Sequence, residues 1–367
     1  MPDQTTAHKL TERTATEKQL SMKYYTQHLM NGKSLNVKEM TGAMNMIMTG
    51  SATPVEMAAF LTALSMKGES TEELVAAAAV MRHHALRLPA SCGSCVDTCG
   101  TGGDGGTTFN VSTAAAITAA AAGVRILKHG NRSVSSRCGS ADVLEALGID
   151  IHQQPQDAAR ALNRLGMAFL FAPDYHQSMK HAAPVRKELG FRTIFNVLGP
   201  LANPGAPDRQ VVGVFSKKLL QPMAEALRAL GLHRALVVCG EDGIDELTTT
   251  GISHICELKN GTILGYTLSP EDAGLKRSRA ADIAGGDADH NARIILEAFR
   301  GERPAAQDLI ALNAGAVIYV AGRAASVKDG VEKAQRAIRD GRTLEKLRQL
   351  ASGTAAEQPA AEKIMTC

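Results

Sequence analysis

The stretch VDTCGTGGDGGTTFNVST, residues 96–113, decides the fold of this chain. Val96–Cys99 predicts a short buried strand, and the alanine-rich run that opens at Thr113 predicts a helix. Between them stand five glycines within seven residues, from Gly100 to Gly106. Glycine is entropically costly to order, so it is kept where a backbone turns sharply or lets another group approach. The stretch therefore predicts a strand, a glycine loop and a helix whose N-terminus receives a ligand.

The glycine loop favours an anionic ligand, because bare N–H groups and the partial positive charge of a helix start suit phosphate. Gly100, Gly102 and Gly105 match the G-x-G-x-x-G pattern of dinucleotide sites. However, the next predicted strand, 124–127, leads into Lys128, where an NAD site needs an acid for the ribose. The Gly-Lys-Ser/Thr ending of a P-loop is also missing from this loop. Phosphate is thus favoured over NAD.

Acidic residues follow a later predicted strand at 235–239; they are Glu241, Asp242, Asp245 and Glu246. Adjacent carboxylates at a strand end suit a hydrated Mg²⁺ that is shared with substrate phosphates, and a solvated acidic turn is the alternative. No pattern of a nucleophile with its base is evident. These features indicate a reaction that depends on positioning and charge stabilisation.

The chain divides into two kinds of structure. Capping boxes predict three helix starts in the N-terminal third, at Asn36/Glu39, Thr53/Glu56 and Ser70/Glu73. From about Cys92, short apolar runs alternate with helical segments, which predicts an α/β domain with a mostly parallel central sheet and a ligand site at the carboxyl ends of its strands. We expect a flexible tail at 1–22, a helical domain at 23–93, an α/β domain at 94–350 and a C-terminal tail at 351–367.

Composition excludes several classes of function. Aromatic residues make up 4%, Trp is absent and the formal net charge is +3, which argues against a nucleic-acid partner. No apolar run approaches the ~18 residues of a membrane span, and no signal peptide is recognisable, so we expect a cytoplasmic protein without a membrane partner. The seven cysteines are an odd number in such a chain and favour free thiols.

Five blocks occur in order along the chain: VDTCGTGGDGGTTFNVST, KHGNRSVSSRCGSADVLEALG, FLFAPDYH, PVRKELGFRTIFNVLGPLANP and DGIDEL. Together they resemble the anthranilate phosphoribosyltransferase family of tryptophan biosynthesis, from about Tyr24 to Leu350. The resemblance implies a fold of the nucleoside-phosphorylase/phosphoribosyltransferase type, with a small N-terminal helical domain and a larger α/β domain. It also implies that residues 190–206 cross back to the helical domain, and that homodimers form through the helical domains.

The activity that the resemblance implies is transfer of the phosphoribosyl group from PRPP to the amine of anthranilate. The products would be N-(5-phosphoribosyl)anthranilate and pyrophosphate, and Mg²⁺ is the implied cofactor. One departure from the family is Cys138, where the motif commonly has Ser. A cysteine there would slightly weaken any contact that the hydroxyl makes with the diphosphate.

The family motifs assign roles to individual residues. The implied PRPP contacts are Gly100, Gly102, Gly103, Asp104, Thr108, Asn110, Ser112, Thr113, Lys128 and Ser140. The implied metal ligands are Ser112, Asp245 and Glu246. The implied anthranilate contacts are Gly100, Asn131, Tyr175 and Arg186. The residues expected to act in catalysis are Lys128, Asp104 and His129, the last as a hypothetical general base.

Three other functions fit parts of the sequence. A pyrimidine nucleoside phosphorylase has a related fold and a glycine loop for phosphate, but the KHGNRSVSS and NVLGPLANP blocks argue against it. A non-catalytic, nucleic-acid-binding relative would have a basic face and damaged PRPP motifs, whereas these motifs are intact and the net charge is small. An NAD oxidoreductase is disfavoured by Lys128 at the position of the ribose acid.

Overall fold

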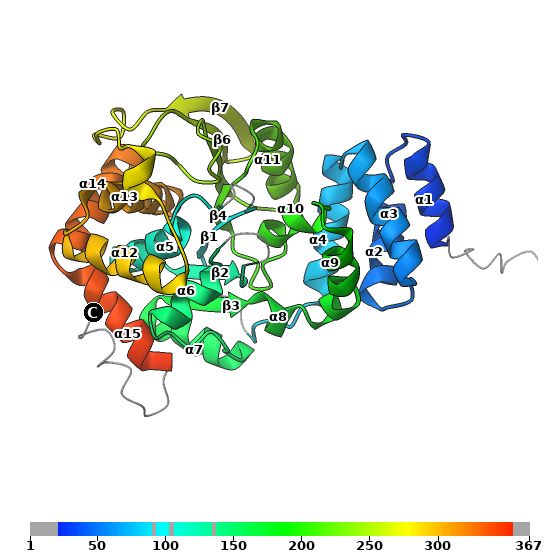
Figure 1. Ribbon diagram of the computed structural model, residues 1–367, viewed down its shortest axis with the longest axis horizontal. Coiled ribbons are helices and arrows are strands. Elements are labelled where there is room, and N and C mark those ends of the chain that lie inside the picture. The colour runs from blue at the N-terminus through cyan, green and yellow to red at the C-terminus, as the bar shows by residue number, and fades with distance from the viewer. Residues whose placement is uncertain (1–20, 90–92, 103–105, 134–136, 355–367) are drawn as a thin grey trace, which may run out of the picture.

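The computed structural model describes residues 21–89, 93–102, 106–133 and 137–354. They form a bundle of helices beside a larger part built on a sheet (Figure 1). Gly103 and Asp104 lie outside the described residues, as does most of each expected tail. Within the described ranges, no helix is both long and apolar enough to cross a bilayer.

The helical part begins with four helices: α1 (Met22–Met30), α2 (Val37–Met48), α3 (Pro54–Lys67) and α4 (Thr71–His84). The three predicted capping boxes are confirmed. The side chains of Asn36, Thr53 and Ser70 each accept a hydrogen bond from the backbone N–H three residues on, and the glutamate at that position accepts one from the backbone N–H of the capping residue. Two later helices join this bundle: α9 (Ala183–Leu189) packs on α3, and α10 (Phe195–Leu201) packs on α4. Helix α10 lies within the stretch 190–206, for which a return to the helical domain stays a prediction.

The larger part contains a seven-stranded sheet in the order β3-β2-β1-β4-β5-β6-β7. The strands are β1 (Val96–Gly100), β2 (Ile126–Gly130), β3 (Met167–Phe171), β4 (Arg209–Gly213), β5 (Arg234–Gly240), β6 (Ser253–Lys259) and β7 (Thr262–Leu268). Strands β1 to β5 pair in parallel, and only β6 and β7 are antiparallel to their neighbours. The mostly parallel sheet predicted from the sequence is confirmed.

Helices cover both faces of the sheet, so the central strands are buried on both sides. Along β4, Val211 joins the core formed with one layer of helices, and its neighbour Val212 joins the core shared with α10 and the helical bundle. The helices of this part are α5 (Val111–Ala121), α6 (Ser140–Ala146), α7 (Pro155–Leu165), α8 (Ala172–Tyr175), α11 (Leu220–Ala229), α12 (Ala288–Arg300), α13 (Pro304–Val320), α14 (Val327–Arg339) and α15 (Arg342–Thr354). Short 3₁₀ helices lie at η1 (Gln177–His181), η2 (Lys217–Leu219) and η3 (Ala280–Ile283).

Two boundaries differ from the sequence prediction. Strand β2 is Ile126–Gly130 and not 124–127, because the polar residues Lys128 and His129 are buried inside the sheet. Helix α15 continues to Thr354, into the segment expected to be a tail from 351. Ala351 is buried there, and Arg164 donates a hydrogen bond to the carbonyl of Gly353. The domain boundaries as a whole stay predictions.

Candidate active site

The carboxyl ends of the central strands place three glycines side by side. Gly100 ends β1, Gly213 ends β4 directly opposite it, and Gly130 ends β2. Ligands of parallel α/β sheets bind at this edge. The loop that follows Gly100 leads into α5, whose first turn carries N–H groups without partners inside the helix. This edge is therefore the candidate site.

The acidic residue Asp245 is held by the start of the glycine loop. Its Oδ2 accepts a hydrogen bond of 2.7 Å from the backbone N–H of Gly102, which has a positive φ of 67°. A Cβ on Gly100 would lie 2.2 Å from the same Oδ2. A side chain at position 100 would therefore displace the Asp245 carboxylate.

Ser112 joins an acid and a cation at the start of α5. Its backbone N–H donates to Oε1 of Glu246 over 3.1 Å, and its Oγ accepts from Nζ of Lys128 over 3.3 Å. Lys128 is 1% exposed and also donates to the carbonyl of Thr98 at 2.5 Å. A buried ammonium beneath a helix N-terminus makes this point strongly attractive to a phosphate.

Asn110, the N-cap residue of α5, has both ends of its amide occupied. Its Nδ2 donates to the carbonyl of Cys138 over 3.1 Å, and its Oδ1 accepts from Nδ2 of Asn291 over 3.0 Å. Asn110 thereby ties the helix start to the segment that contains Cys138. Any contact of this side chain with PRPP has to be made in addition to these two bonds.

Three further predicted PRPP contacts lie around this edge. Thr108 pairs with Ala284 in a single antiparallel bridge. The Thr113 hydroxyl is buried, and no partner for it lies within the described part of the chain. Ser140 starts α6 and donates to the carbonyl of Asn131 over 3.3 Å, so a PRPP contact and an anthranilate contact are neighbours. Gly103 and Asp104 fall in the part of the loop that is not described.

Tyr175 follows the carboxyl end of β3, but its side chain is buried in a core. The Tyr175 ring is 1% exposed and belongs to a core cluster with Leu162 and Leu170. Its hydroxyl donates to the carbonyl of Gln153 over 3.0 Å. Tyr175 is therefore a core residue, a placement that does not favour its predicted contact with anthranilate. The FLFAPDYH block alone does not determine the direction of this ring.

His129 points away from the phosphate side, towards α10. Its Nδ1 lies 3.2 Å from the carbonyl of Gly199, and its ring centroid is 5.0 Å from that of His176. Burial, with a smaller effect of His176, lowers the pKa of His129 to about 3. An imidazole with such a pKa is a weak base at neutral pH. This placement does not favour the general-base hypothesis.

Arg186 lies on α9, in the helical part of the molecule. Its guanidinium carbon is 5.1 Å from the ring centroid of Phe195, and burial lowers the pKa of the guanidinium. Arginine stays charged nonetheless. The predicted anthranilate contacts Asn131 and Arg186 therefore come from the two different parts of the fold.

The donor set of the acid pair fits Mg²⁺. Asp245 and Glu246 are adjacent, oxygen is the ligand type that Mg²⁺ prefers, and both acids adjoin the N–H groups at which a phosphate is expected. Within the described residues, no group of three His, Cys, Asp or Glu side chains gathers as a metal cluster. Substrate phosphate and water would therefore supply the other ligands.

Comparisons with known proteins identify the family of the chain. A model described as "Glycosyl transferase family, a/b domain" matches residues 92–344, and one described as "Glycosyl transferase family, helical bundle domain" matches 23–85. An anthranilate phosphoribosyltransferase from Brevibacillus brevis is 51% identical over 333 residues, covering 90% of this chain and 98% of that protein. The chain belongs to the anthranilate phosphoribosyltransferase family.

Solved structures of the anthranilate phosphoribosyltransferase family have the same fold. The crystal structure of the Thermus thermophilus protein aligns with a TM-score of 0.84 at 43% identity, covering 90% of this chain and 99% of that chain. The Saccharomyces cerevisiae protein in complex with PRPP and Mg aligns with a TM-score of 0.81 at 28% identity, covering 92% and 98%. The family that the sequence motifs indicated is confirmed.

Two buried asparagines support the site of this family member, and the sequence analysis did not single them out. Asn291 on α12 holds Asn110, and Asn313 on α13 binds both the N–H and the carbonyl of Leu247, over 3.0 and 2.9 Å. Leu247 directly follows the acid pair. For Asn313 a signal existed, namely one amide inside the apolar run LIALNAGAVIYV; a buried amide needs partners.

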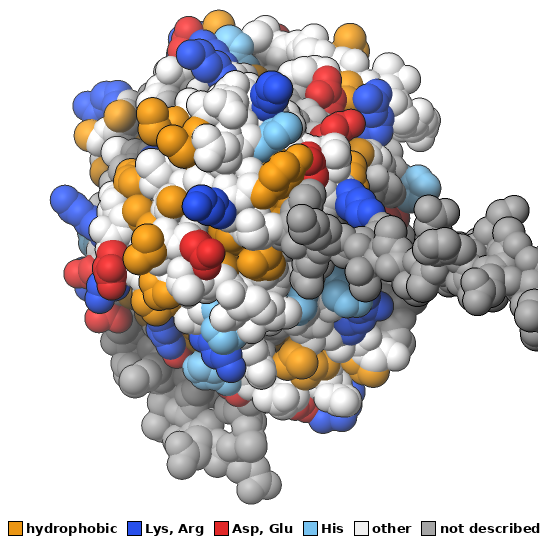
Figure 2. All heavy atoms as spheres, turned by 90° about the vertical axis from the view of Figure 1, so that its right-hand side faces the viewer, with side chains coloured by type: hydrophobic (Ala, Val, Ile, Leu, Met, Phe, Trp, Pro, Cys, Tyr) orange, Lys and Arg blue, Asp and Glu red, His pale blue; other side chains and the backbone are white. Residues whose placement is uncertain are grey.

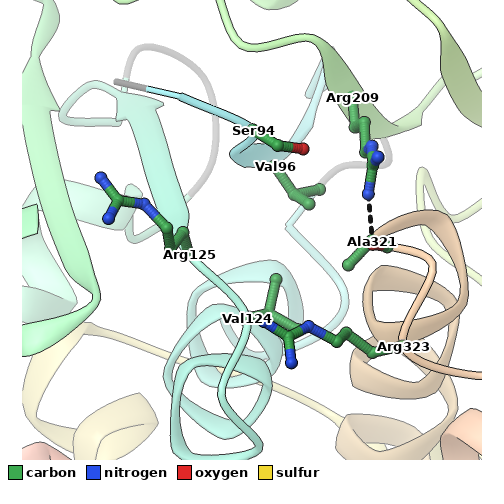
Figure 3. A pocket seen from close by; sticks show the side chains of 7 residues that line it. All are labelled: Ser94, Val96, Val124, Arg125, Arg209, Ala321 and Arg323. Atoms are coloured by element: carbon green, nitrogen blue, oxygen red, sulfur yellow. Dashed lines mark hydrogen bonds between the residues drawn. The ribbon is translucent and has the colours of Figure 1, made fainter. Parts of the chain in front are cut away.

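A separate cavity of about 230 Å³ lies at the opposite, N-terminal edge of the strands. Three arginines line it, but their guanidinium groups point in different directions (Figure 3). Arg209 donates to the carbonyl of Ala321, and Arg125 donates to Asn163. Because the charges do not converge on one point, this cavity is not a second anion site.

Proposed function

We propose that this protein transfers the phosphoribosyl group of PRPP to the amine of anthranilate, in tryptophan biosynthesis, and releases pyrophosphate. The observation that carries the proposal is the buried ammonium of Lys128, which lies beneath the Ser112 hydroxyl at the N-terminus of α5. It adds a full positive charge to a helix start that already favours phosphate.

The donor side follows from this charge. As the bond between the ribose carbon and the diphosphate lengthens, negative charge grows on the leaving group and positive charge on the ribose ring. Lys128 and the N–H groups of α5 stabilise the first of these charges at fixed positions, which is more effective than reorganising water. Mg²⁺, when held by Ser112, Asp245 and Glu246, neutralises further charge on the diphosphate.

The acceptor side uses residues from both parts of the fold. Arg186 binds the carboxylate of anthranilate, for which the planar guanidinium is well suited, and Asn131 orients the acceptor beside Ser140. The aromatic amine is unprotonated at neutral pH, so it attacks without a strong base. We therefore assign His129 to packing against α10 rather than to proton transfer.

We also propose that two copies associate through their helical parts. Large apolar side chains are exposed on α1 to α3, among them Met30 at 71%, Val55 at 79% and Met66 at 85%. Figure 2 shows hydrophobic side chains on this end of the molecule. Several exposed apolar side chains on one end are typical of an interaction site.

The test of the activity is the loss of anthranilate fluorescence in the presence of purified protein, PRPP and Mg²⁺. We expect a loss that depends on PRPP and is abolished by EDTA. Lys128→Met, which keeps an unbranched side chain one atom shorter but removes its charge, should abolish most of the rate. A protein that leaves the fluorescence unchanged and shows no PRPP binding by calorimetry would refute the proposed function.

A further inference from the structure

Asp97 is a fully buried carboxylate to which no catalytic role has been given. It lies in β1 and is 0% exposed. Its Oδ1 accepts from the backbone N–H of His129 over 3.2 Å, and its Oδ2 accepts from Nδ2 of Asn203 over 2.9 Å. A buried charge is costly unless it is hydrogen-bonded, so these two contacts are a defined arrangement rather than incidental packing.

Asn203, itself 1% exposed, has both ends of its amide satisfied. Besides Asp97, its Nδ2 donates to the carbonyl of Leu127 over 2.9 Å, and its Oδ1 accepts from the N–H of Gly205 over 2.9 Å. Leu127 and His129 are the two neighbours of Lys128 in β2. The Asp97–Asn203 pair therefore holds the backbone on both sides of Lys128.

The turn at residues 203–206, which contains Asn203, packs directly against β2. A Cβ on Gly205 would lie 2.0 Å from Cδ2 of Leu127, so a side chain there would have to displace the buried Leu127 side chain. The next residue, Ala206, has a φ of 44°, in the left-handed region that a non-glycine residue rarely adopts. Strained backbone of this kind persists where its surroundings determine it strongly and is common beside functional sites.

The same turn follows α10, which packs on the helical bundle. Arg82 of α4 donates to the carbonyl of Leu201 over 2.7 Å, and Gln210 of β4 donates to the carbonyl of Pro200 over 2.7 Å. These two bonds hold residues 190–206, the crossing segment, but do not contact β2. Asn203 is different, because it connects this segment to the carbonyl of Leu127, directly before Lys128.

We propose that Asp97 and Asn203 are positioning residues that set the place of the Lys128 ammonium beneath the leaving diphosphate. This inference rests on the proposed function, in which Lys128 meets the diphosphate of PRPP. It assigns the pair a role in donor binding and bond breaking, beyond docking one part of the fold on the other. Placement of a charged group matters because a displacement of about 1 Å can cost ~100-fold in rate.

The test compares Asp97→Asn and Asn203→Leu with Gln210→Met. Asp97→Asn replaces one acceptor by a donor and so loses either the His129 or the Asn203 contact. Asn203→Leu removes the contacts to Asp97 and Leu127. Gln210→Met is the matched control, because it removes a buried amide that donates to the same crossing segment and to Sγ of Cys99 in β1, without touching β2.

Steady-state kinetics with PRPP and with anthranilate separate the two roles. For Asp97→Asn and Asn203→Leu, we expect kcat/KM for PRPP to fall on the order of ten- to a hundred-fold, while the KM for anthranilate changes less than about two-fold. Binding of inorganic diphosphate with Mg²⁺, measured by calorimetry, should weaken in parallel. Gln210→Met should lose thermal stability but keep the PRPP kinetics of the wild type.

The inference is overturned if folded Asp97→Asn and Asn203→Leu show the same PRPP kinetics as Gln210→Met while the wild type is active. If Asn203→Leu does not fold, the milder Asn203→Ser takes its place in the comparison. A wild type that neither consumes anthranilate nor binds PRPP overturns the proposed function and this inference together. An active wild type with unaltered variants overturns the inference alone.

Discussion

Asp245 occupies a space that exists only because residue 213 is glycine. A Cβ at Gly213 would lie 1.4 Å from the backbone oxygen of Asp245, and a backbone atom cannot rotate out of the way. Gly213 and Gly100 face each other in neighbouring strands, and both leave room for the same residue. Glycine at positions 100 and 213 thus leaves the space in which Asp245 lies at the carboxyl edge of the sheet.

Gly213→Ala should therefore displace the acid pair and destabilise the protein by at least about 3 kcal/mol, the upper range for overpacking. Urea unfolding measures this loss. The matched control is Gly265→Ala in β7, where the nearest atom to the new Cβ is 3.9 Å away. If both variants unfolded at the wild-type urea concentration, the close approach at Gly213 would be wrong.

Asn313→Leu should raise the Mg²⁺ concentration needed for half-maximal rate several-fold. The variant leaves the N–H and the carbonyl of Leu247 buried without Asn313, so the loop after the acid pair can shift. We expect a loss of about 2 kcal/mol in stability as well, from the unsatisfied backbone groups. Mg²⁺ titrations of the rate, together with calorimetry of diphosphate and Mg²⁺, measure the effect on the site.

Leu312→Ala separates stability from positioning. Leu312 is buried on the same helix and its truncation should cost about 2–5 kcal/mol through a cavity. Since this change leaves the Asn313 amide in place, the Mg²⁺ requirement should stay that of the wild type. An equal shift in both variants would mean that Asn313 acts only through global stability.

Much of the donor side could be predicted from the sequence, because local rules govern it. Capping boxes determine where helices begin, and the strand–glycine–helix order brings Gly102 and Ser112 to one edge of the sheet. The contacts of Asp245 with Gly102 and of Glu246 with Ser112 join segments more than a hundred residues apart. Because Asp245 and Glu246 are acidic and follow a predicted strand, the sequence still indicated that they lie at the same edge.

The acceptor side and the supporting residues were harder to predict, because tertiary packing decides them. The FLFAPDYH block contains Tyr175, yet whether its ring faces a ligand or the core depends on what α7 places beneath it. Asp97 looks like an ordinary strand residue until the crossing segment brings Asn203 to it. No period or spacing in the sequence contains that information.

Cys138→Ser should change the KM for PRPP by less than about two-fold, in contrast to the small weakening that the family motif suggested. Asn110 donates a hydrogen bond to the backbone carbonyl of Cys138, and the exchange to serine leaves this carbonyl in place. Burial raises the pKa of the Cys138 thiol to about 11, so it stays protonated at neutral pH and should resist alkylation. Kinetics of Cys138→Ser beside Asn110→Leu, which should raise KM, would show which group matters.

Stability should fall as the pH is lowered from 7 to 5, because of two buried imidazoles. Burial lowers the pKa of His129 to about 3 and that of His176 to about 4, both from an ordinary value of 6.5. In this range the unfolded chain binds more protons at these residues than the native protein does, so each contributes a loss of about 2 kcal/mol.

Protonation of Asp97 has the opposite effect on stability as the pH is lowered. Burial raises its pKa to about 6 from 3.8, so the native protein binds the extra proton and gains about 1 kcal/mol between pH 7 and 5. Urea unfolding at the two pH values should therefore rank the wild type, His176→Phe and Asp97→Asn by the stability that each loses on acidification. His176→Phe should lose less stability on acidification than the wild type, and Asp97→Asn should lose more. A wild type that is equally stable at both pH values, with the same result for His176→Phe, would show that the two imidazoles are not buried in their neutral form.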